Sequence, residues 1–460
     1  MKNQFIRCLH LDLKGLPPTA SRLLSLLDIM HASGFNAVLV EWEDMFPWTV
    51  DRKFRATTAY RETDIKRFAA KARRLGIEII PLVQCLGHME MVLRLPKYAR
   101  LREVAGQNDV MNPLAPGARE LVRSMVNDAL RLTPDVRYFH LGGDEAWTFG
   151  KHNDTAAYIK RHGDSGLYMD YLSPLLTELN ARGIRPILWH DMMVHWDTAS
   201  LKRLGTIADL CVWGYKVYDR VKEPWLHPVD KRDLKNPWPI MAGGGGPITD
   251  SLLRRFTSHG VTIWGASAFK AAEHREDVKE RAANTRQWAE ISARYGLRGV
   301  VATGWSRNNS HELQRTPLEC NLDLMVCAGL TLNGARDNAL KKSEQVLKKL
   351  KVWKHFSECA ELAGKMEKQR QESWKKIQML WEYVAEARID RERRSNVVAE
   401  KTYGYLGNHI DALSRLSAAF LKATKNHIQP LWAKRYCDER LMPIIMNREI
   451  VRRKLSFQKK

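Results

Sequence analysis

The chain lacks the sequence features that mark disulfide scaffolds, zinc sites, secreted precursors and membrane-spanning proteins. Its seven cysteines are an odd number with no CxxC pair among them, which argues against a disulfide framework or a zinc site and favours a reducing compartment. No apolar stretch of about 18 residues occurs, and the first residues carry no apolar signal core. We therefore expect a folded cytoplasmic protein with no membrane partner.

Positive charge is in excess and is unevenly spread along the chain. The formal net charge is +22 over 460 residues, and residues 336–460 alone hold 29 Lys+Arg against 15 Asp+Glu. Such an excess can attract nucleic acid or other polyanions. No nucleic-acid motif accompanies it, so we expect a helical surface rich in Lys and Arg and do not expect a nucleic-acid partner.

Short apolar runs alternate with amphipathic helical patterns from residue 5 to about residue 330. Several of the helical patterns end in a glycine just before the next run, as a helix that turns into a strand does. The expected strands are Phe5–Leu11, Ala37–Glu41, Glu78–Leu82, Arg137–Leu141, Arg185–Trp189, Asp209–Trp213, Thr262–Ala266 and Gly299–Thr303. Eight such units predict a (β/α)8 TIM barrel. A doubly wound open sheet is the alternative, but no glycine-rich nucleotide loop follows the first strand.

Two segments depart from this alternation. Residues 216–247 form a long connection with several aromatic residues and the run Gly243–Gly246, and we expect a loop over the barrel mouth. The glycine run lacks the Gly-Lys-Ser/Thr of a phosphate loop. Residues 336–460 show only helical periodicity, with helices expected over Val397–Leu421 and Leu431–Lys454. We expect a catalytic barrel at 1–335 and a basic, all-helical C-terminal region that packs on the barrel or forms a homo-oligomer.

The stretch His140-Leu-Gly-Gly-Asp-Glu145 closes the fourth expected strand with two glycines and two adjacent carboxylates. In a β/α barrel the carboxyl ends of the strands carry the chemistry. Two acids there can divide the work, one protonating a leaving group and the other stabilising a developing cation. An Asp-Glu pair taken alone is more often a solvated surface turn, so its interpretation depends on the other strand ends.

All eight expected strands end in polar or aromatic side chains, a recurrence that packing alone does not explain. The set contains acids, bases and tryptophans but no phosphate loop and no Cys/His metal cluster, so it suits a carbohydrate that stacks on aromatic faces and is gripped through its hydroxyls. The side chains are Arg7, His10, Asp12 and Lys14; Glu41, Glu43 and Asp44; Gln84 and His88; Asp144 and Glu145; Trp189, His190 and Asp191; Trp213 and Tyr215; Ser267 and Lys270; Trp305 and Arg307.

These segments resemble glycoside hydrolase family 20, the β-N-acetylhexosaminidases, and within it the hexosaminidase D branch. The stretch ending in Asp144 and Glu145 matches the family signature His-x-Gly-Gly-Asp-Glu. The other matching segments follow in the family's order over about residues 5–310 and leave the helical tail uncovered. They are Arg7–Gly15, Glu43–Pro47, Ile80–Gln84 with Gly87–Glu90, Leu101–Val104, Trp189–Met192, Ala266–Lys270 and Thr303–Trp305.

The resemblance implies a substrate-assisted, retaining hydrolysis of a terminal β-linked GlcNAc or GalNAc, without metal or organic cofactor. The sugar's own 2-acetamido oxygen attacks the anomeric carbon, Glu145 acts as the acid and then the base, and Asp144 orients the acetamido group. By the same resemblance Arg7 would bind O3 and O4, and His88 would tune the acid. The remaining substrate-binding residues would be Trp189, Asp191, Trp213, Tyr215 and Trp305.

The chain also departs from the wider family in ways that leave alternatives open. Arg307 stands where a glutamate is common, and Phe269 stands near the place of a tyrosine that Tyr215 would replace, so the preference between GlcNAc and GalNAc is undecided. One alternative is a barrel that has lost catalysis and binds sugars or polyanions. Another is a glycosidase that uses Asp191 or Glu43 as a covalent nucleophile.

Overall fold

The computed structural model describes residues 4–217, 250–307, 312–335, 338–389 and 396–455 of the chain. Most of the long loop expected at 216–247, including its tryptophans and Gly243–Gly246, lies outside these residues. The expected extension over the barrel mouth therefore stays a prediction.

Eight parallel strands close into a barrel in sequence order, which confirms the predicted (β/α)8 class. The strands are β1 (Ile6–Asp12), β2 (Ala37–Glu41), β3 (Glu78–Leu82), β4 (Tyr138–His140), β5 (Arg185–Trp189), β6 (Asp209–Trp213), β7 (Ile263–Lys270) and β8 (Gly299–Gly304). Every residue of β2, β6, β7 and β8 is buried, because barrel strands have side chains inside and helices outside. All strands run in one direction, so their carboxyl ends meet at one mouth of the barrel.

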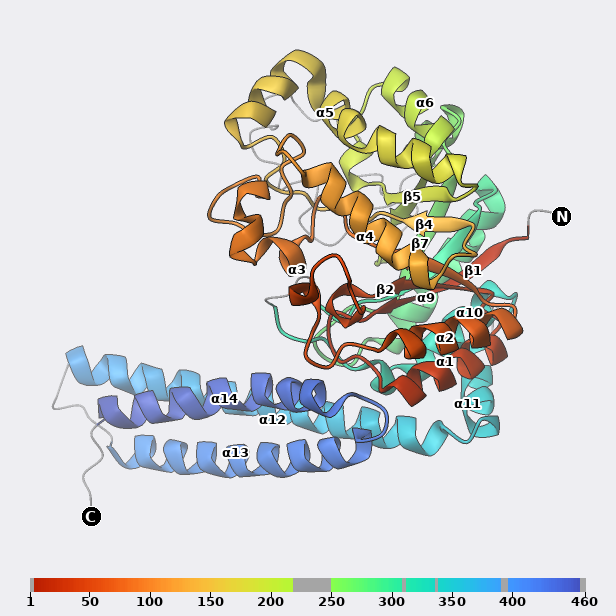
Figure 1. The fold of residues 1–460 in the computed structure, drawn as a ribbon. Coiled ribbons are helices and arrows are strands. Elements are labelled where there is room, and N and C mark those ends of the chain that lie inside the picture. The colour runs from red at the N-terminus through yellow and green to blue at the C-terminus, as the bar shows by residue number, and fades with distance from the viewer. Residues whose placement is uncertain (1–3, 218–249, 308–311, 336–337, 390–395, 456–460) are drawn as a thin grey trace.

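Helices surround the barrel and connect its strands (Figure 1). They are α1 (Ala20–Ala32), α2 (Glu62–Arg74), α3 (Glu90–Leu93), α4 (Ala118–Leu132), α5 (Asn153–Ala181), α6 (Thr198–Ile207), α8 (Asp250–Ser258), α9 (Val278–Tyr295) and α10 (Leu322–Leu332). Short 3-10 turns are η1 (Glu43–Met45), η2 (Arg52–Phe54), η3 (Pro96–Leu101), η4 (Asp191–Met193) and η6 (Leu318–Cys320). Helix α5 is broken at Gly163, whose φ of 75° lies outside the helical region.

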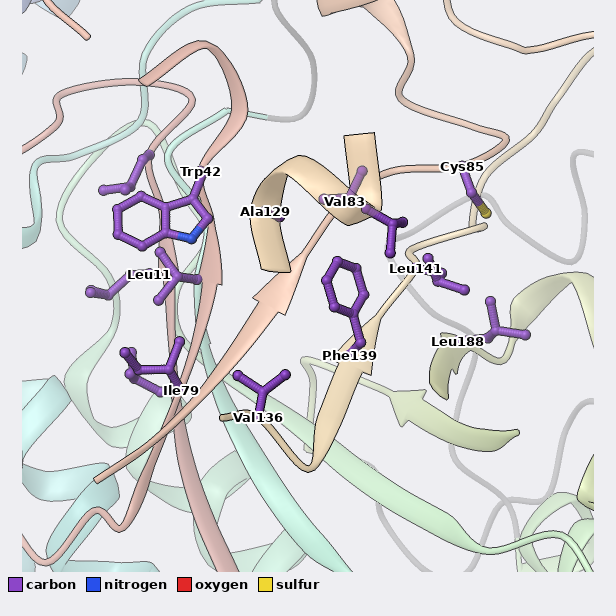
Figure 2. Packing of buried hydrophobic residues seen from close by; sticks show 14 of the residues in the cluster. Leu11, Trp42, Ile79, Val83, Cys85, Ala129, Val136, Phe139, Leu141 and Leu188 are labelled. Carbon is purple, nitrogen blue, oxygen red and sulfur yellow. The ribbon is translucent and has the colours of Figure 1, made fainter. Parts of the chain in front are cut away.

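Two apolar layers hold the barrel together. The outer layer lies between the strands and the helices. It includes Ala129 of α4, Val83 just after β3 and Phe139 of β4, all labelled in Figure 2. The inner layer fills the barrel with aliphatic residues such as Leu39 and Ile187 and ends toward the mouth in the rings of Trp189 and Trp213. The mouth therefore has an aromatic floor supplied by the ends of the strands.

The C-terminal region is helical, as the sequence predicted. After α11 (Ala339–Lys349), the long helices α12 (Trp353–Ile389), α13 (Asn396–Thr424) and α14 (Pro430–Leu455) pack side by side and extend away from the barrel (Figure 1). Their own apolar core includes Met366, Leu413 and Ile444. The division at residue 335 and a homo-oligomer through these helices stay predictions.

No described helix has both the length and the apolar character that crossing a bilayer requires. All seven cysteines are buried and none forms a disulfide. The cytoplasmic location expected from the sequence stays a prediction.

Candidate active site

The turn after β4 has a backbone conformation that requires glycine at two positions. Gly142 and Gly143 have φ of 61° and 82°, and a Cβ on Gly142 would lie 1.7 Å from Oε1 of Gln84. Glu145 also has positive φ, 46°, although it carries a side chain. A residue other than glycine held in this region costs about 1–3 kcal/mol and occurs most often at functional sites. The turn is therefore built to present Asp144 and Glu145.

The imidazole of His88 lies between the two acids. Its Nε2 is 3.5 Å from Oδ2 of Asp144 and 3.3 Å from Oε2 of Glu145. Burial lowers the pKa of His88, but the two carboxylates outweigh burial and hold the pKa well above its usual value. His88 has a φ of 54°, so it shares the unusual backbone of Glu145. A cation therefore stands between two carboxylates at the mouth.

Asp191, just after β5, supports the turn that carries Asp144 and Glu145, here called the acid turn, from the other side. Its Oδ2 accepts a hydrogen bond from the backbone N–H of Glu145 at 2.9 Å, and its Oδ1 accepts from Nε1 of Trp213 at 3.2 Å. Burial and the charges of Asp144 and Glu145 raise the pKa of Asp191 to about 7. Asp191 thus ties the acid turn to the aromatic wall.

The aromatic wall is formed by the ends of β5, β6 and β8. Trp213 stacks on Tyr215 with ring centroids 5.5 Å apart, and the Tyr215 hydroxyl accepts from Nε1 of Trp305 at 3.0 Å. Trp189 lies fully buried beneath Trp305, with ring centroids 6.0 Å apart. Within the described residues, the buried Nε1 of Trp189 has no hydrogen-bond partner.

The opposite side of the mouth is built around Glu41 at the end of β2. Its carboxylate lies 2.6 Å from Nζ of Lys14 and 3.2 Å from Nε2 of His10, and it accepts from Nε2 of Gln84 at 3.1 Å. Burial raises the pKa of Glu41, but Lys14 and His10 outweigh burial and hold the pKa far below its usual value. The ammonium of Lys14 also lies 5.2 Å from the centre of the Trp305 ring.

These contacts join into a ring around the mouth. Lys14 contacts Trp305 and Trp305 contacts Tyr215, which stacks on Trp213. Trp213 contacts Asp191, which bonds to Glu145, and Glu145 pairs with His88. The loop after β3 joins His88 to Gln84 along the chain. Gln84 bonds to Glu41, and Glu41 pairs with Lys14, which closes the ring. The end of β7 completes it, because Nζ of Lys270 donates to the carbonyl of Trp305.

The structure brings most of the sequence-predicted site residues into this ring. Asp144, with 6% of its surface exposed, lies in the turn after β4. Phe269 packs in the outer core, whereas Tyr215 bonds to Trp305 at the mouth, as the sequence-based alternative expected. The predicted residues that lie in or beside the ring are Asp144, Glu145, His88, Trp189, Asp191, Trp213, Tyr215 and Trp305.

The prediction for Arg7 was wrong. Arg7 is the second residue of β1 and lies at the amino end of the strand, where its Nε donates to the carbonyl of Gly34 at 2.6 Å. In a barrel of parallel strands this end is opposite the mouth. Arg7 therefore cannot bind a sugar held by Asp144 and Glu145.

Sequence reasoning also missed part of the site. Lys14, Glu41 and Gln84 were recognised at strand ends but were not selected as site residues. Lys14, two residues past the end of β1, is the cation that pairs with Glu41 at the mouth. Arg307 pairs with Glu439 of α14, and only 2% of its side chain is exposed. It therefore does not take the place of the family's glutamate in the pocket.

The chemistry of this mouth is proton transfer and stacking. In the described part of the chain, no three His, Cys, Asp or Glu side chains are grouped so as to hold a metal ion. Paired acids, one imidazole and a tryptophan wall can protonate a leaving oxygen and hold a sugar ring. Fold and pocket together define a (β/α)8 barrel enzyme with a carbohydrate-type active site.

The comparisons with known proteins agree with this class. The model of the glycosyl hydrolase family 20 catalytic domain matches residues 27–218. Proteins named hexosaminidase D from Bos taurus and Homo sapiens are each 29% identical to this chain. The bovine match covers 72% of this chain and 92% of the relative, and the human match covers 74% and 69%.

Solved structures show the same fold. The Flavobacterium johnsoniae chitobiase matches with a TM-score of 0.56 at 14% identity, covering 97% of this chain and 72% of that one. A β-N-acetylhexosaminidase from Bacteroides fragilis matches with a TM-score of 0.54 at 14% identity, covering 75% and 70%. The chain thus carries a region similar to the catalytic domain of glycosyl hydrolase family 20 and is similar over about three quarters of its length to proteins named hexosaminidase D, and it is a glycoside hydrolase.

Proposed function

We propose that this enzyme is an exo-acting β-N-acetylhexosaminidase that removes terminal β-linked GlcNAc or GalNAc from glycans by substrate-assisted hydrolysis. The observation that carries the proposal is the acid pair Asp144–Glu145, held on a strained turn beside His88 and facing a wall of tryptophans. The relatives named hexosaminidase D support the same activity.

The two acids take different roles because they sit differently in the turn. The side chain of Glu145 is 26% exposed, against 8% for Asp144, so Glu145 is the acid that can reach a glycosidic oxygen entering from solvent. Glu145 donates its proton to that oxygen while the acetamido oxygen of the sugar bonds to the anomeric carbon. The bond between the anomeric carbon and the glycosidic oxygen breaks, and the rest of the glycan leaves as an alcohol. The resulting ring is opened by water, which returns its proton to Glu145.

Asp144 acts on the acetamido group during these steps. Its carboxylate accepts a hydrogen bond from the acetamido N–H and stabilises the positive charge that develops there. Its buried Oδ1 has no hydrogen-bond partner within the described residues and is the oxygen left for this contact. A buried acceptor without a partner costs about 1–3 kcal/mol, which a substrate N–H would recover.

Asp191 and Lys14 receive roles that differ from the sequence-based assignment. Both carboxylate oxygens of Asp191 are already bonded to Glu145 and Trp213, so it positions those two groups and does not contact the sugar. Lys14 lies between Glu41 and the Trp305 ring, and we assign it the binding of sugar hydroxyls in place of Arg7.

The alternative of a covalent carboxylate nucleophile has less support. Asp191 has no oxygen without a protein partner to attack the sugar. Glu43 is buried and lines a small cavity that Gln84 and His88 also line, so it lies behind these two residues. An inhibitor that mimics the cyclic intermediate, a thiazoline, distinguishes the two mechanisms, because it should bind tightly only to a substrate-assisted enzyme.

The experiment that tests the proposal is hydrolysis of paired aryl β-GlcNAc and β-GalNAc substrates by the wild type, Glu145→Gln and Asp144→Asn. We expect activity on at least one sugar and a loss of about a hundredfold or more in each variant, the scale of general-acid and electrostatic effects. A wild type that hydrolyses neither sugar would defeat the proposed activity. Full activity in Glu145→Gln would show that the acid is another residue.

A further inference from the structure

The last helix, α14, reaches the barrel mouth with one face. Trp432, Glu439 and Arg440 lie on that face, at the seven- and eight-residue spacing of neighbours along a helix. Trp432 and Arg440 are buried, and Nε1 of Trp432 donates to the hydroxyl of Thr58 at 3.1 Å. The helical tail is therefore attached to the loops that carry the pocket.

Glu439 connects α14 to the segment that follows β8. Its Oε1 accepts from Nη2 of Arg307 at 3.3 Å and from Nε of Arg435 at 2.9 Å. Its Oε2 accepts from the backbone N–H of Gln314 at 2.9 Å and from Nε2 of the same residue at 3.4 Å. Charge-assisted hydrogen bonds of this kind are roughly twice as strong as neutral ones.

Arg440 and Gln314 extend the connection to two further loops. Nη2 of Arg440 donates to the carbonyls of Glu273, after β7, and Gln314, after β8, at 3.0 and 2.9 Å. The side chain of Gln314 is fully buried, and its Oε1 accepts from the backbone N–H of Leu16, after β1, at 3.0 Å. One face of α14 thus holds three loops of the mouth.

Trp305 lies at the point where these loops meet. The next residue, Ser306, accepts from the backbone N–H of Arg315 at 2.9 Å and donates its own N–H to Asp12 at 2.7 Å. Arg307 follows and lies 5.4 Å from the centre of the Trp432 ring. The segment after Trp305 is therefore joined to α14 through the side chain of Arg307, and through the carbonyl of Ser306 to Arg315, the neighbour of Gln314.

We propose that the α14 face of Trp432, Glu439 and Arg440 positions Trp305, so that the C-terminal helical region is part of the sugar-binding machinery. The inference rests on the proposed function, because Trp305 is assigned there to the wall of the 2-acetamido sugar pocket. Positioning residues of this kind act through another side chain. A displacement of about 1 Å at a binding group can cost up to a hundredfold in rate.

The test compares Glu439→Ala with Glu449→Ala. Glu449 lies on the same helix, and among the described residues its exposed carboxylate pairs locally with Arg452, so it is the matched control. We expect Glu439→Ala to raise both KM for the aryl substrate and Ki for a thiazoline inhibitor by about tenfold, while the control stays within about twofold. A merely structural role would lower the amount of active enzyme and leave KM and Ki unchanged, and that result would overturn the proposal.

Two further measurements keep the test decisive. If Glu439→Ala does not fold, Glu439→Gln, which keeps the size and one acceptor oxygen, is held to the same KM and Ki criterion. In the background Trp305→Ala, the Glu439 substitution should add little further loss, because both act through the same side chain. Full multiplication of the two losses would contradict the proposal.

The outcomes also separate this inference from the proposed function. A wild type that hydrolyses 2-acetamido sugars while Glu439→Ala keeps normal KM and Ki overturns the role of α14 alone. A wild type that hydrolyses neither sugar overturns both. A rise in KM and Ki confined to Glu439 variants supports both.

Discussion

The two sides of the barrel mouth are built in different ways. On the acid side, His88, Asp144, Glu145 and Asp191 come from short segments whose sequence already specifies the turn. On the lysine side, Lys14 is held by Glu41, and the neighbouring Trp305 is held by loops that contact α14, more than a hundred residues later. The acid side is thus encoded locally, whereas the lysine side depends on contacts across the whole chain.

The difference explains which function each side can have. The acid side carries groups whose protonation depends on one another, since burial and two carboxylates raise the pKa of Asp191 to about 7. The lysine side carries a buried network of charges, in which Lys14 pairs with both Asp12 and Glu41. The first arrangement suits proton transfer and the second suits fixed binding of the sugar.

Outside the acid pair itself, the largest effect is expected on the lysine side. Replacing Lys14 by Met together with Glu41 by Gln removes both charges of the pair, so neither is left buried alone. We expect kcat/KM for the aryl sugar to fall by about a hundredfold because the hydroxyl-binding cation is lost. Steady-state kinetics with a thermal unfolding curve measure this. A double variant with normal kcat/KM would show that Lys14 does not bind substrate.

A smaller effect is expected for Asp191→Asn. An Asn offers one acceptor oxygen, so it cannot accept from both Glu145 and Trp213, and we expect kcat/KM to fall by about tenfold. In the wild type, ionised Asp191 makes both contacts, so kcat/KM should decline as the pH falls below about 7. The pH–rate profile of the variant should lack this limb. An unchanged profile would contradict the positioning role.

Asp191 also links stability to pH. Its pKa is raised to about 7 in the folded state from the usual value of about 4 for an aspartic acid, so its contribution to stability is present below about pH 4 and is lost as the pH rises toward 7. The unfolding midpoint of Asp191→Asn should therefore change less than that of the wild type between these pH values. Thermal unfolding in a series of buffers measures the difference.

The acid turn predicts a stability effect with an internal control. Gly142→Ala places a methyl group 1.7 Å from Gln84 at a φ of 61°, whereas Gly76→Ala has a similar φ of 68° and nothing within 4 Å. We expect a loss of about 1 kcal/mol for Gly76→Ala and about 1–3 kcal/mol more for Gly142→Ala, from the added clash. Urea unfolding measures both. Equal losses would mean that Gln84 moves aside freely.

The smallest effect is expected at Arg7. Arg7→Met removes a hydrogen bond to Gly34 at the end of the barrel opposite the mouth. The loss in stability should be about 1 kcal/mol, and kcat/KM should stay within about threefold of the wild type. A large loss of activity with normal stability would restore the role in sugar binding that the structure removes.

The sequence predicts the barrel well because each strand is a short apolar run between polar turns. The bounds of β2, β3, β5 and β6 agree with the expected ranges to the residue. The expected β7 stopped at Ala266, yet the strand continues to Lys270, because Ser267 and Lys270 are buried and keep the ladder despite their polarity. Polar residues that end a run in sequence do not always end a strand.

The sequence predicted the residues of the acid turn but not those that depend on distant contacts, and the reason is physical. Asp144 and Glu145 follow two glycines at a strand end, a pattern that a local sequence can show. Arg7 was misplaced because the resemblance to the family outweighed strand polarity, which puts the start of β1 opposite the mouth. The contacts of Glu439 with Arg307 and Gln314 have no local signal, since they form only when the helical region packs on the barrel.

The central claim is that the sugar's own acetamido oxygen is the nucleophile, guided by Asp144 and Glu145. The most direct test is the rate of hydrolysis of aryl 2-acetamido sugars whose acetyl methyl carries zero, one, two or three fluorines. Each fluorine withdraws electron density from the acetamido oxygen, so the account predicts that kcat falls with each fluorine added. A rate that does not change along the series would contradict it.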